Sequence, residues 1–552
     1  MHEFPHPQSL PSEEGKPVSF RSPLPRLVPI FLVFALLMVV VVRVRMTGFP
    51  LERDEGEYAY AGQLILEGIP PYKLVCNMKL PGTYLAYAGL MSIFGQTAEG
   101  IHFGLLVVDL ASMLVLFALA RKLLDLDGAV IAAAAFGLMT LSPAFLGFAA
   151  HATHFVLLPA LLATWMLLRV EKSGRLSGSL VCGCLFGIAF VMKQPGVFFG
   201  IFGGLYLGWS SIAGRVAWPR VLALLGVYSL GCLAPFLAVC AWLKMAGVFP
   251  QFWFWTFSYA REYAAITSLH QGFEFAEYTF ARIFKADPLV WIIAALGFAC
   301  LWVTGQAWRT RIFLTGFLGF SFLSVCPGLY FRGHYFVLLV PAVALLAGFA
   351  VTRAGEWLKE KNTAPRVRGL PFLLAAIACL LGLYMDRAVF FLLTPSEASR
   401  KVYGICPFPE AVEIARYIEL HSTPDQRIAV IGSEPEIYFY AHRHSSSGQI
   451  YMYPLMEEQP FARRMQKDMI RDIGRNPPEY LVFVAISYSW NASPKSSREV
   501  LDWMSDYVKG MQLVGIIQFV RPAPVSVWGP RAAETRLDSN DFITVYKRIK
   551  PS

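Results

Sequence analysis

The chain has 552 residues, of which 56% are hydrophobic and only 16% are charged, and its mean hydropathy is +0.49. Soluble globular proteins do not have this composition, so a soluble enzyme or binding domain is excluded for the chain as a whole. We attribute the net charge of +10 to membrane topology and to contact with anionic lipids, and we expect no binding of nucleic acid.

Apolar runs recur along the first two thirds of the chain, each close to the length of about 20 residues that crosses a bilayer as a helix. Residues 1–26 are polar, and no small-residue cleavage site follows the first run. We therefore expect a cytoplasmic N-terminal tail and a retained first span. Residues 27–393 are predicted to form a polytopic α-helical transmembrane domain with eleven spans: 27–45, 101–120, 129–147, 154–169, 179–194, 197–213, 221–243, 288–305, 312–328, 335–352 and 370–390.

The first outer loop, residues 46–100, carries an acidic cluster at the expected bilayer surface. Asp54 and Glu55 open an amphipathic helical pattern, and ionisable groups in such a position are functional candidates. Because the two carboxylates are adjacent and partly desolvated, we expect a raised pKa for Asp54. Asp54 and Glu57 also have the spacing of a helix capping box, which is the structural alternative. Residues 80–94 are apolar but short and predict an interfacial helix.

Lysine and arginine collect in alternate loops. This bias predicts that those loops and the N-terminus are cytoplasmic and that the C-terminus lies outside. It places the Asp54 loop and Lys193 on the outer side as well. The basic positions that set the orientation are Arg121, Lys122, Arg169, Lys172, Arg175, Arg215, Arg220, Arg309, Arg311 and residues 353–368.

The composition changes near Pro395, and residues 394–552 are predicted to form an extracytoplasmic α/β domain. The glycine turn after its first strand lacks the three-glycine fingerprint of a nucleotide site, so a tight turn is favoured over phosphate binding. The nine cysteines do not have the spacing of a disulfide framework. The sequence does not decide whether two of Cys76, Cys326 and Cys406 form one disulfide on the outer side. The expected strands are 427–432, 480–486, 512–519 and 542–547, and the expected helices are 409–420, 457–473 and 496–508.

Three segments together resemble one enzyme family. They are the acidic helix after the first span with its Lys79-Leu80-Pro81-Gly82 turn, the turn at residues 190–196, and the Arg332-Gly333-His334-Tyr335 segment. Over residues 27–352 the chain is similar to the C-type glycosyltransferases, most of all to glycosyltransferase family 39, the protein O-mannosyltransferases and the bacterial aminoarabinose lipid A transferases. The resemblance implies a polyprenyl-phosphate-linked sugar donor and contact with membrane lipids. It also implies a glycan, lipid or protein acceptor at the outer face of the membrane.

The resemblance also implies roles for single residues. Asp54 is the expected general base, with Glu55 orienting it or sharing the role. Lys79, Lys193 and Arg332 are expected to contact the lipid phosphate, and His334 and Tyr335 to contact substrate. Snorkelling to head groups is the alternative for the two lysines, and interfacial packing is the alternative for Arg332 and His334.

One segment departs from the family pattern. Where relatives carry an acidic residue before the fourth span, this chain has His151 and His154, three residues apart on one expected helix face. Both are candidate substrate contacts, and simple packing at the interface is the alternative. Two histidines alone are an incomplete metal site, so the sequence establishes no cofactor. Binding of a divalent metal is an alternative that the sequence does not decide. The aromatic residues 252–259 predict an interfacial belt, with sugar stacking as the alternative.

Two other function classes stay open. A transporter or flippase of a lipid-linked or polar substrate is compatible with eleven spans, although the sequence has no duplicated halves. A non-catalytic membrane scaffold is the other alternative, with the C-terminal domain as its binding module. The bacterial inner membrane is the expected location, because the C-terminal domain resembles that of bacterial members.

Overall fold

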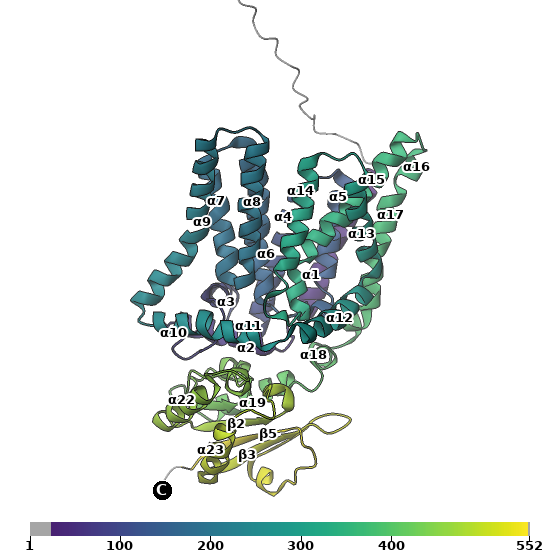
Figure 1. Cartoon of the computed structure of the whole chain (residues 1–552). Helices are drawn as coiled ribbons and strands as arrows, with labels where there is room; N and C mark the ends of the chain where they lie inside the picture. The colour runs from purple at the N-terminus through teal and green to yellow at the C-terminus, as the bar shows by residue number, and fades with distance from the viewer. Residues whose placement is uncertain (1–23, 550–552) are drawn as a thin grey trace, which may run out of the picture.

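The computed structural model describes residues 24–549 as a helical bundle, a layer of shorter helices across one end of it, and a C-terminal α/β domain packed on that layer (Figure 1). Six described helices or helix pairs are long and apolar enough to cross a membrane, and the bent pair α12–α13 would make a seventh. They are α1 (Leu27–Arg45), α4 (Ala98–Ala120), α6 (Ala152–Ser173), η2 with α8 (Gln194–Ala213), α9 (Trp218–Met245) and α16 with α17 (Pro365–Met385).

Other helices of the bundle explain why the count of eleven spans stays a prediction. At about 1.5 Å per residue, a helix of 14–17 residues is shorter than a hydrocarbon core of about 30 Å. Helix α15 is longer but carries charged residues in its last two turns. These helices are α5 (Leu126–Met139), α7 (Leu176–Met192), α13 (Pro288–Val303), α14 (Trp308–Leu323) and α15 (Val340–Glu360).

The basic loops gather at the end of the bundle that lies away from the C-terminal domain (Figure 1). Lys122 and Arg169 both lie over the ring of Trp165, and Arg309 pairs with Glu171 at 3.4 Å. The loops predicted to be cytoplasmic are therefore neighbours in space, on the side opposite the Asp54 loop.

Short helices form the layer between the bundle and the C-terminal domain. Helix α2 begins with a capping box in which Glu52 and Glu55 each bond the backbone N–H of the other, so the alternative box of Asp54 and Glu57 is wrong. The segment 80–94 is a helix, as predicted. The layer contains α2 (Arg53–Leu66), α3 (Pro81–Phe94), α10 (Phe249–Trp253), the π segment η3 (Phe254–Tyr259), α11 (Ala260–Ile266) and α12 (Leu269–Ala286).

The C-terminal domain is a five-stranded sheet in the order β1-β2-β5-β3-β4, with helices packed beside it. Strands β1 and β2 are parallel and the other pairs are antiparallel, so Ala429 lies beside Leu481 and Val482 beside Val545. All four predicted strands are confirmed, and β4 was missed. The strands are β1 (Ile428–Ile431), β2 (Tyr480–Ala485), β3 (Met511–Gln518), β4 (Val525–Trp528) and β5 (Phe542–Arg548).

The predicted helices of this domain are present as well. The domain's helices are α18 (Pro395–Tyr403), α19 (Phe408–Leu420), α20 (Glu436–Ala441), α21 (Tyr453–Met456), α22 (Ala462–Arg475) and α23 (Glu499–Tyr507). The remaining short segments of the chain are η1 (Pro143–Phe145), η4 (Pro327–Leu329), η5 (Gly333–Leu338), η6 (Ala388–Leu392), η7 (Ser487–Ser489), η8 (Val508–Gly510) and η9 (Gly529–Glu534).

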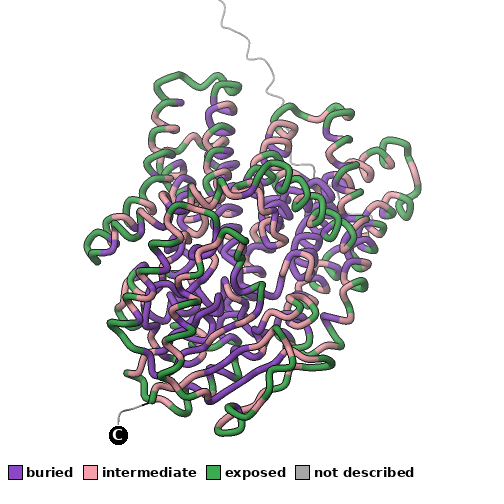
Figure 2. Tube along the Cα trace, turned by 60° about the horizontal axis from the view of Figure 1, so that its bottom comes forward, coloured by how far each residue is buried: buried purple, intermediate pink, exposed green. Residues whose placement is uncertain are grey.

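Helix α2 and the C-terminal domain share one hydrophobic core. The buried trace, in purple, is concentrated in the middle of the molecule (Figure 2). The rings of Tyr60 and Tyr438 stack at 5.2 Å. A Cβ on Gly56 would lie 2.5 Å from the backbone nitrogen of Glu436, so only glycine permits this approach of α2 to α20. The C-terminal domain therefore fixes the helix that carries Asp54.

Candidate functional site

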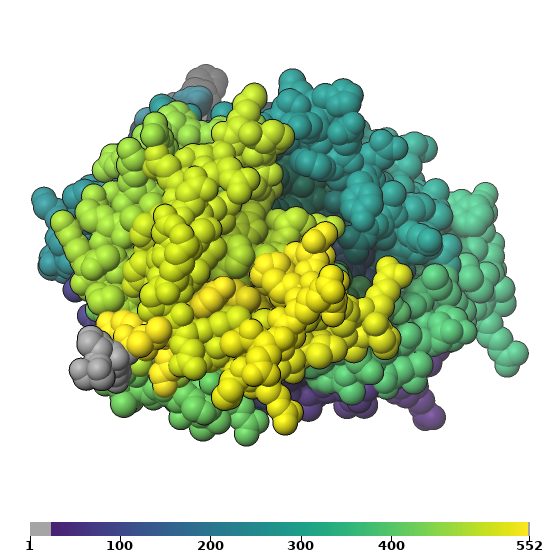
Figure 3. Space-filling view, turned by 90° about the horizontal axis from the view of Figure 1, so that it is seen from below, coloured from purple at the N-terminus to yellow at the C-terminus, as the bar shows by residue number. Residues whose placement is uncertain are grey.

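A pocket lies where helix α2, the loop after it, the segment before η5 and the C-terminal domain meet. Seen from below, the C-terminal domain in yellow-green spreads over this end of the molecule and leaves a hollow beside the teal segment (Figure 3). The pocket is lined by Asp54, Asn77, Met78, Lys79, Tyr259, Tyr263, Arg332, Tyr335, Tyr451, Tyr453, Pro454 and Glu457.

Asp54 projects into this pocket from the first turn of α2 and is 6% exposed. Its Oδ1 accepts a hydrogen bond from Lys79 Nζ at 3.2 Å and lies 3.5 Å from the hydroxyl of Tyr451. Burial alone would raise the pKa of Asp54, but the nearby cations, chiefly Lys79, hold it below its ordinary value. The expected raised pKa is therefore wrong, because cations rather than Glu55 dominate the field at Asp54.

Glu55 has different surroundings from its neighbour. It is fully buried, it is absent from the pocket lining, and it accepts bonds from His102 Nε2 at 3.0 Å and from the backbone nitrogen of Ala150 at 2.6 Å. With its bond from the Glu52 nitrogen, the carboxylate joins α2, α4 and the link before α6. These contacts fix the backbone just before His151 and give Glu55 a positioning geometry.

The three predicted phosphate contacts come from separate loops and gather around Asp54. Burial lowers the pKa of Lys79, but Asp54 and Glu57 more than offset it, so the net shift is upward. Burial, with the charge of Lys79, lowers the pKa of Lys193 to about 7. Lys193 Nζ lies 4.3 Å above the ring of Tyr335, which lines the pocket together with Arg332.

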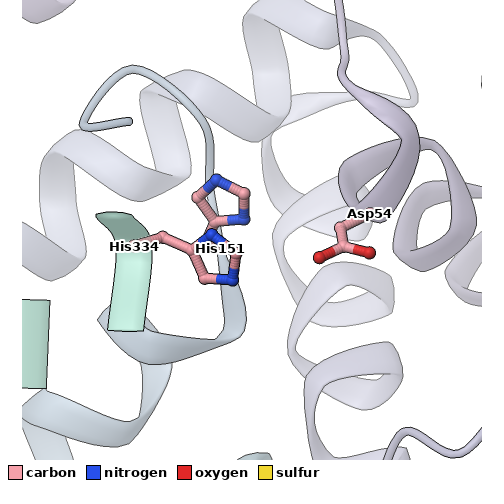
Figure 4. A group of neighbouring side chains, drawn as sticks. All are labelled: Asp54, His151 and His334. Carbon is pink, nitrogen blue, oxygen red and sulfur yellow. The ribbon is translucent and has the colours of Figure 1, made fainter. Parts of the chain in front are cut away.

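His151 and His334 meet Asp54 at one point. The two imidazole rings stack with centroids 4.0 Å apart and planes 14° from parallel, and the three side chains each offer an atom within 4.8 Å of the others (Figure 4). Neither nitrogen of His151 has a hydrogen-bond partner in the described part of the chain, and the same holds for Nδ1 of His334. Burial lowers the pKa of His151 to about 3 and that of His334 well below its ordinary value, so both rings are neutral.

This cluster fits a divalent metal. Neutral imidazoles and a carboxylate are the ligands that Zn²⁺ prefers, and the unpartnered buried ring nitrogens supply the lone pairs. Glu52 Oε1 lies 3.6 Å from His151 Nδ1, beyond hydrogen-bond distance, and burial beside Asp54 and Glu55 raises the pKa of Glu52 well above its ordinary value.

The structure separates His154 from this cluster. His151 precedes helix α6, whereas His154 lies inside it and points to Asp109, with 2.9 Å between His154 Nδ1 and the carboxylate. Asp109 in turn pairs with Arg43. The expectation that the two histidines share a helix face fails because His151 is extended and stacks on His334 instead.

Several pocket residues were not foreseen from the sequence. Tyr451, Tyr453 and Glu457 come from the C-terminal domain, and Tyr259 donates to Glu457 at 2.6 Å. No sequence motif marks the first three. Only the aromatic segment that includes Tyr259 had sugar stacking as an alternative. Glu57, considered from the sequence only as a capping residue, lies behind the pocket lining. It accepts bonds from Asn77 and Tyr84, and burial raises its pKa to about 7.

Comparison with known proteins gives both a sequence match and fold matches. Residues 79–242 match the family described as dolichyl-phosphate-mannose-protein mannosyltransferase. No curated protein matches the chain. ArnT from Cupriavidus metallidurans bound to undecaprenyl phosphate is 15% identical with a TM-score of 0.55, over 94% of this chain and 98% of ArnT.

Two structures of the oligosaccharyltransferase from Archaeoglobus fulgidus are also similar. The complex of AglB with an inhibitory peptide and a dolichol-phosphate is 12% identical with a TM-score of 0.54, over 93% of this chain and 75% of that one. The complex with Zn and sulfate is 13% identical with a TM-score of 0.50, over 90% and 73%. Residues 79–242 are thus similar in sequence to the mannosyltransferase family, and most of the chain has the fold of these solved structures, which confirms the predicted resemblance.

Proposed function

We propose that this protein transfers a sugar from a polyprenyl-phosphate donor to the hydroxyl of a glycan, lipid or protein acceptor, with Asp54 as the general base. One observation carries the proposal: an ionised, buried carboxylate lies beside Lys79 in a pocket that also holds Arg332 and aromatic rings. Basic groups that gather around one carboxylate suit a reaction in which a phosphate leaves as a proton is removed.

The donor phosphate would bind to Lys79, Arg332 and Lys193. Charge-assisted hydrogen bonds from such cations are the strong ones for phosphate oxygens. An apolar groove of about 800 Å³ between α7, α8 and α9 is lined by residues on both sides of Lys193, including Phe190 and Val197. A polyprenyl chain fits this groove, and solved structures of similar fold are described with undecaprenyl phosphate and dolichol-phosphate.

In the transfer step, the acceptor hydroxyl oxygen forms a bond to the anomeric carbon while the bond from that carbon to the phosphate oxygen breaks. The hydroxyl proton passes to Asp54, and the electron pair leaves with the polyprenyl phosphate, whose charge Lys79 and Arg332 stabilise. The donor phosphate also offsets the cations that lower the pKa of Asp54, so the carboxylate becomes a stronger base once the donor is bound.

In an alternative role for Asp54, its carboxylate would join His151 and His334 in holding a divalent metal beside this pocket. The metal would supply positive charge near the donor phosphate. The test is metal analysis of the purified protein by mass spectrometry. We expect His334→Ala to lose the metal that the wild type retains, and metal-free wild-type protein would contradict the assignment.

The charge bias of the loops supports an outward-facing pocket, with the C-terminal domain outside. The resemblance of the C-terminal domain to that of bacterial family members is the basis for proposing a bacterial inner membrane. The experiment that tests the function is incubation of the purified protein with lipid extracts that contain polyprenyl-phosphate sugars, followed by mass spectrometry. Release of free polyprenyl phosphate, together with a co-purifying lipid of matching mass, is the expected result. Intact donor after prolonged incubation with a full range of acceptors would contradict the proposal.

A further inference from the structure

A second pocket, separate from the Asp54 pocket, lies between the membrane domain and helix α22 of the C-terminal domain. Its volume is about 540 Å³. The walls come from the loop after α2, from the α10–η3 segment, and from the C-terminal domain at Gln449 and along α22. Both halves of the molecule therefore contribute to it.

Aromatic rings line the pocket from both halves. Tyr72, Phe254 and Trp255 belong to the membrane domain, and Phe461 belongs to the C-terminal domain. Phe254 and Phe461 meet edge to face at 5.0 Å across the junction. Aromatic faces beside hydrogen-bonding groups suit ligands with one apolar face and a polar rim, as a sugar ring has.

Gln449 supplies an unused hydrogen-bonding group. Gln449 lines the pocket and is only 8% exposed, and its buried Oε1 atom has no hydrogen-bond partner in the described residues. An unpartnered amide oxygen buried in this way costs free energy unless a ligand or water bonds to it. A sugar hydroxyl is a donor that would satisfy it.

The charges at the pocket favour a neutral ligand over a phosphate. Asp468 pairs with Arg471 at 2.6 Å and lies 3.7 Å from Arg464. Asp472 accepts a bond from Ser447 at 3.1 Å. Both arginines of the lining are therefore paired with a carboxylate, and Lys73 is the one lining cation without an ion-pair partner in the described residues. A mixed lining of amide, carboxylate and arginine groups bonds hydroxyls well in either direction.

The two pockets share a wall. Cys76 lines this pocket and its neighbour Asn77 lines the Asp54 pocket. The rings of Trp255 and Tyr259, one from each lining, lie 5.2 Å apart. A chain of sugar units bound here would thus lie beside the site of transfer.

We propose that this second pocket, the α22 pocket, is a binding site for a neutral saccharide chain. The proposal rests on the proposed function in one respect, because such a chain would belong to a glycan acceptor. Its binding does not depend on turnover, so the two proposals fail separately.

The test uses the full-length protein in lipid nanodiscs and a panel of soluble hexasaccharides built from mannose, glucose, galactose or arabinofuranose. Binding is measured by isothermal titration calorimetry. At least one hexasaccharide should bind the wild type, and Gln449→Leu and Trp255→Leu should each weaken that binding by about tenfold. Trp253→Leu is the matched control, because Trp253 is a neighbouring tryptophan outside the pocket lining.

Asp54→Asn should bind the same hexasaccharide as tightly as the wild type, because Asp54 lies outside the α22 pocket. Gln449→Leu changes the side chain little in size, so it remains informative if Trp255→Leu fails to fold. Binding by no hexasaccharide above that to empty nanodiscs would overturn the proposal. Undiminished binding by Gln449→Leu, or an equal loss in Trp253→Leu, would overturn it as well.

Discussion

The two sides of helix α2 hold adjacent carboxylates in opposite ways. On one side, Glu55 is closed in by three donors, from His102, Ala150 and Glu52, and faces no pocket. On the other side, Asp54 has a single strong partner, Lys79, and lines a pocket. Successive residues on a helix point about 100° apart, so neighbours in sequence face different surroundings. The comparison teaches that Glu55, whose oxygens are occupied by three donors, positions the parts of the site. Asp54, with one strong partner, is free to act on a substrate.

The largest expected effect is the loss of activity in Asp54→Asn. The change keeps the size of the side chain but removes the base, so transfer should fall by about 10²–10⁴-fold. Turnover of a polyprenyl-phosphate sugar by the purified protein is the measurement. The thermal unfolding midpoint should stay near that of the wild type, because the amide still accepts a bond from Lys79. A stable and fully active variant would contradict the assigned base.

The next effect concerns Glu55→Ala, in which we expect the main loss to be in stability, whereas in Asp54→Asn it is in activity. Removal of the carboxylate leaves the buried His102 ring and the Ala150 nitrogen without their partner, at a cost of about 3–5 kcal/mol in unfolding free energy. Thermal unfolding in nanodiscs measures it. If Glu55→Ala unfolds like the wild type while its turnover collapses, Glu55 acts in the chemistry and the contrast between the two sides is lost.

Lys193 gives a pH-dependent test on the pocket side. Its pKa is lowered to about 7, so it is a cation at pH 6 and mostly neutral at pH 8. The donor is a phosphodiester whose charge does not change in this window. Donor affinity should therefore be higher at pH 6. Lys193→Met should weaken binding at pH 6 by about 10–100-fold, the value of one charge-assisted bond. The measurement is donor titration across this pH range.

Glu57 has to be separated from Lys193 in that experiment. Its pKa is also raised to about 7, so it becomes negative over the same window and would oppose phosphate binding near Lys79. Glu57→Gln removes this contribution. If Glu57→Gln has a flat pH profile while Lys193→Met keeps the slope of the wild type, Lys193 is not a phosphate contact.

Much of the fold followed from the sequence, and the site followed in part. Hydropathy marked the long helices, and alternation marked four of the five strands, because both patterns are local. The predicted roles of Lys79, Lys193 and Arg332 came from the family resemblance and from their positions in three separate outer turns. Local patterns do not predict which turns meet in the folded chain. They therefore could not predict the electrostatic field of the cations that lowers the pKa of Asp54.

The docking of the C-terminal domain was the part that the sequence could not predict. Gly56 appears in the sequence as one more small residue of an acidic helix, and only the close approach of Glu436 explains it. Tyr451 and Tyr453 enter the pocket through the same long-range packing, about 400 positions from Asp54. His151 was placed with His154 by spacing, whereas its true partner is His334, from a distant segment.

The smallest expected effect tests whether the C-terminal domain contributes to the pocket side of α2. The Tyr451 hydroxyl lies 3.5 Å from Asp54 Oδ1, a long contact that adds to the bond from Lys79. Tyr451→Phe should lower turnover by about two- to tenfold, the range of one neutral hydrogen bond, with little change in unfolding.

Tyr453→Phe is the matched control for that substitution. Its hydroxyl bonds Arg53 and the carbonyl of Tyr488 instead of Asp54, so its loss should loosen the contact between α2 and the C-terminal domain. We expect it to lower the unfolding temperature more than Tyr451→Phe does, with a smaller effect on turnover per folded molecule. The opposite ranking would mean that Asp54 depends on the docking of the domain as a whole and not on one hydroxyl. The pocket side of α2 would then be held as firmly as the Glu55 side.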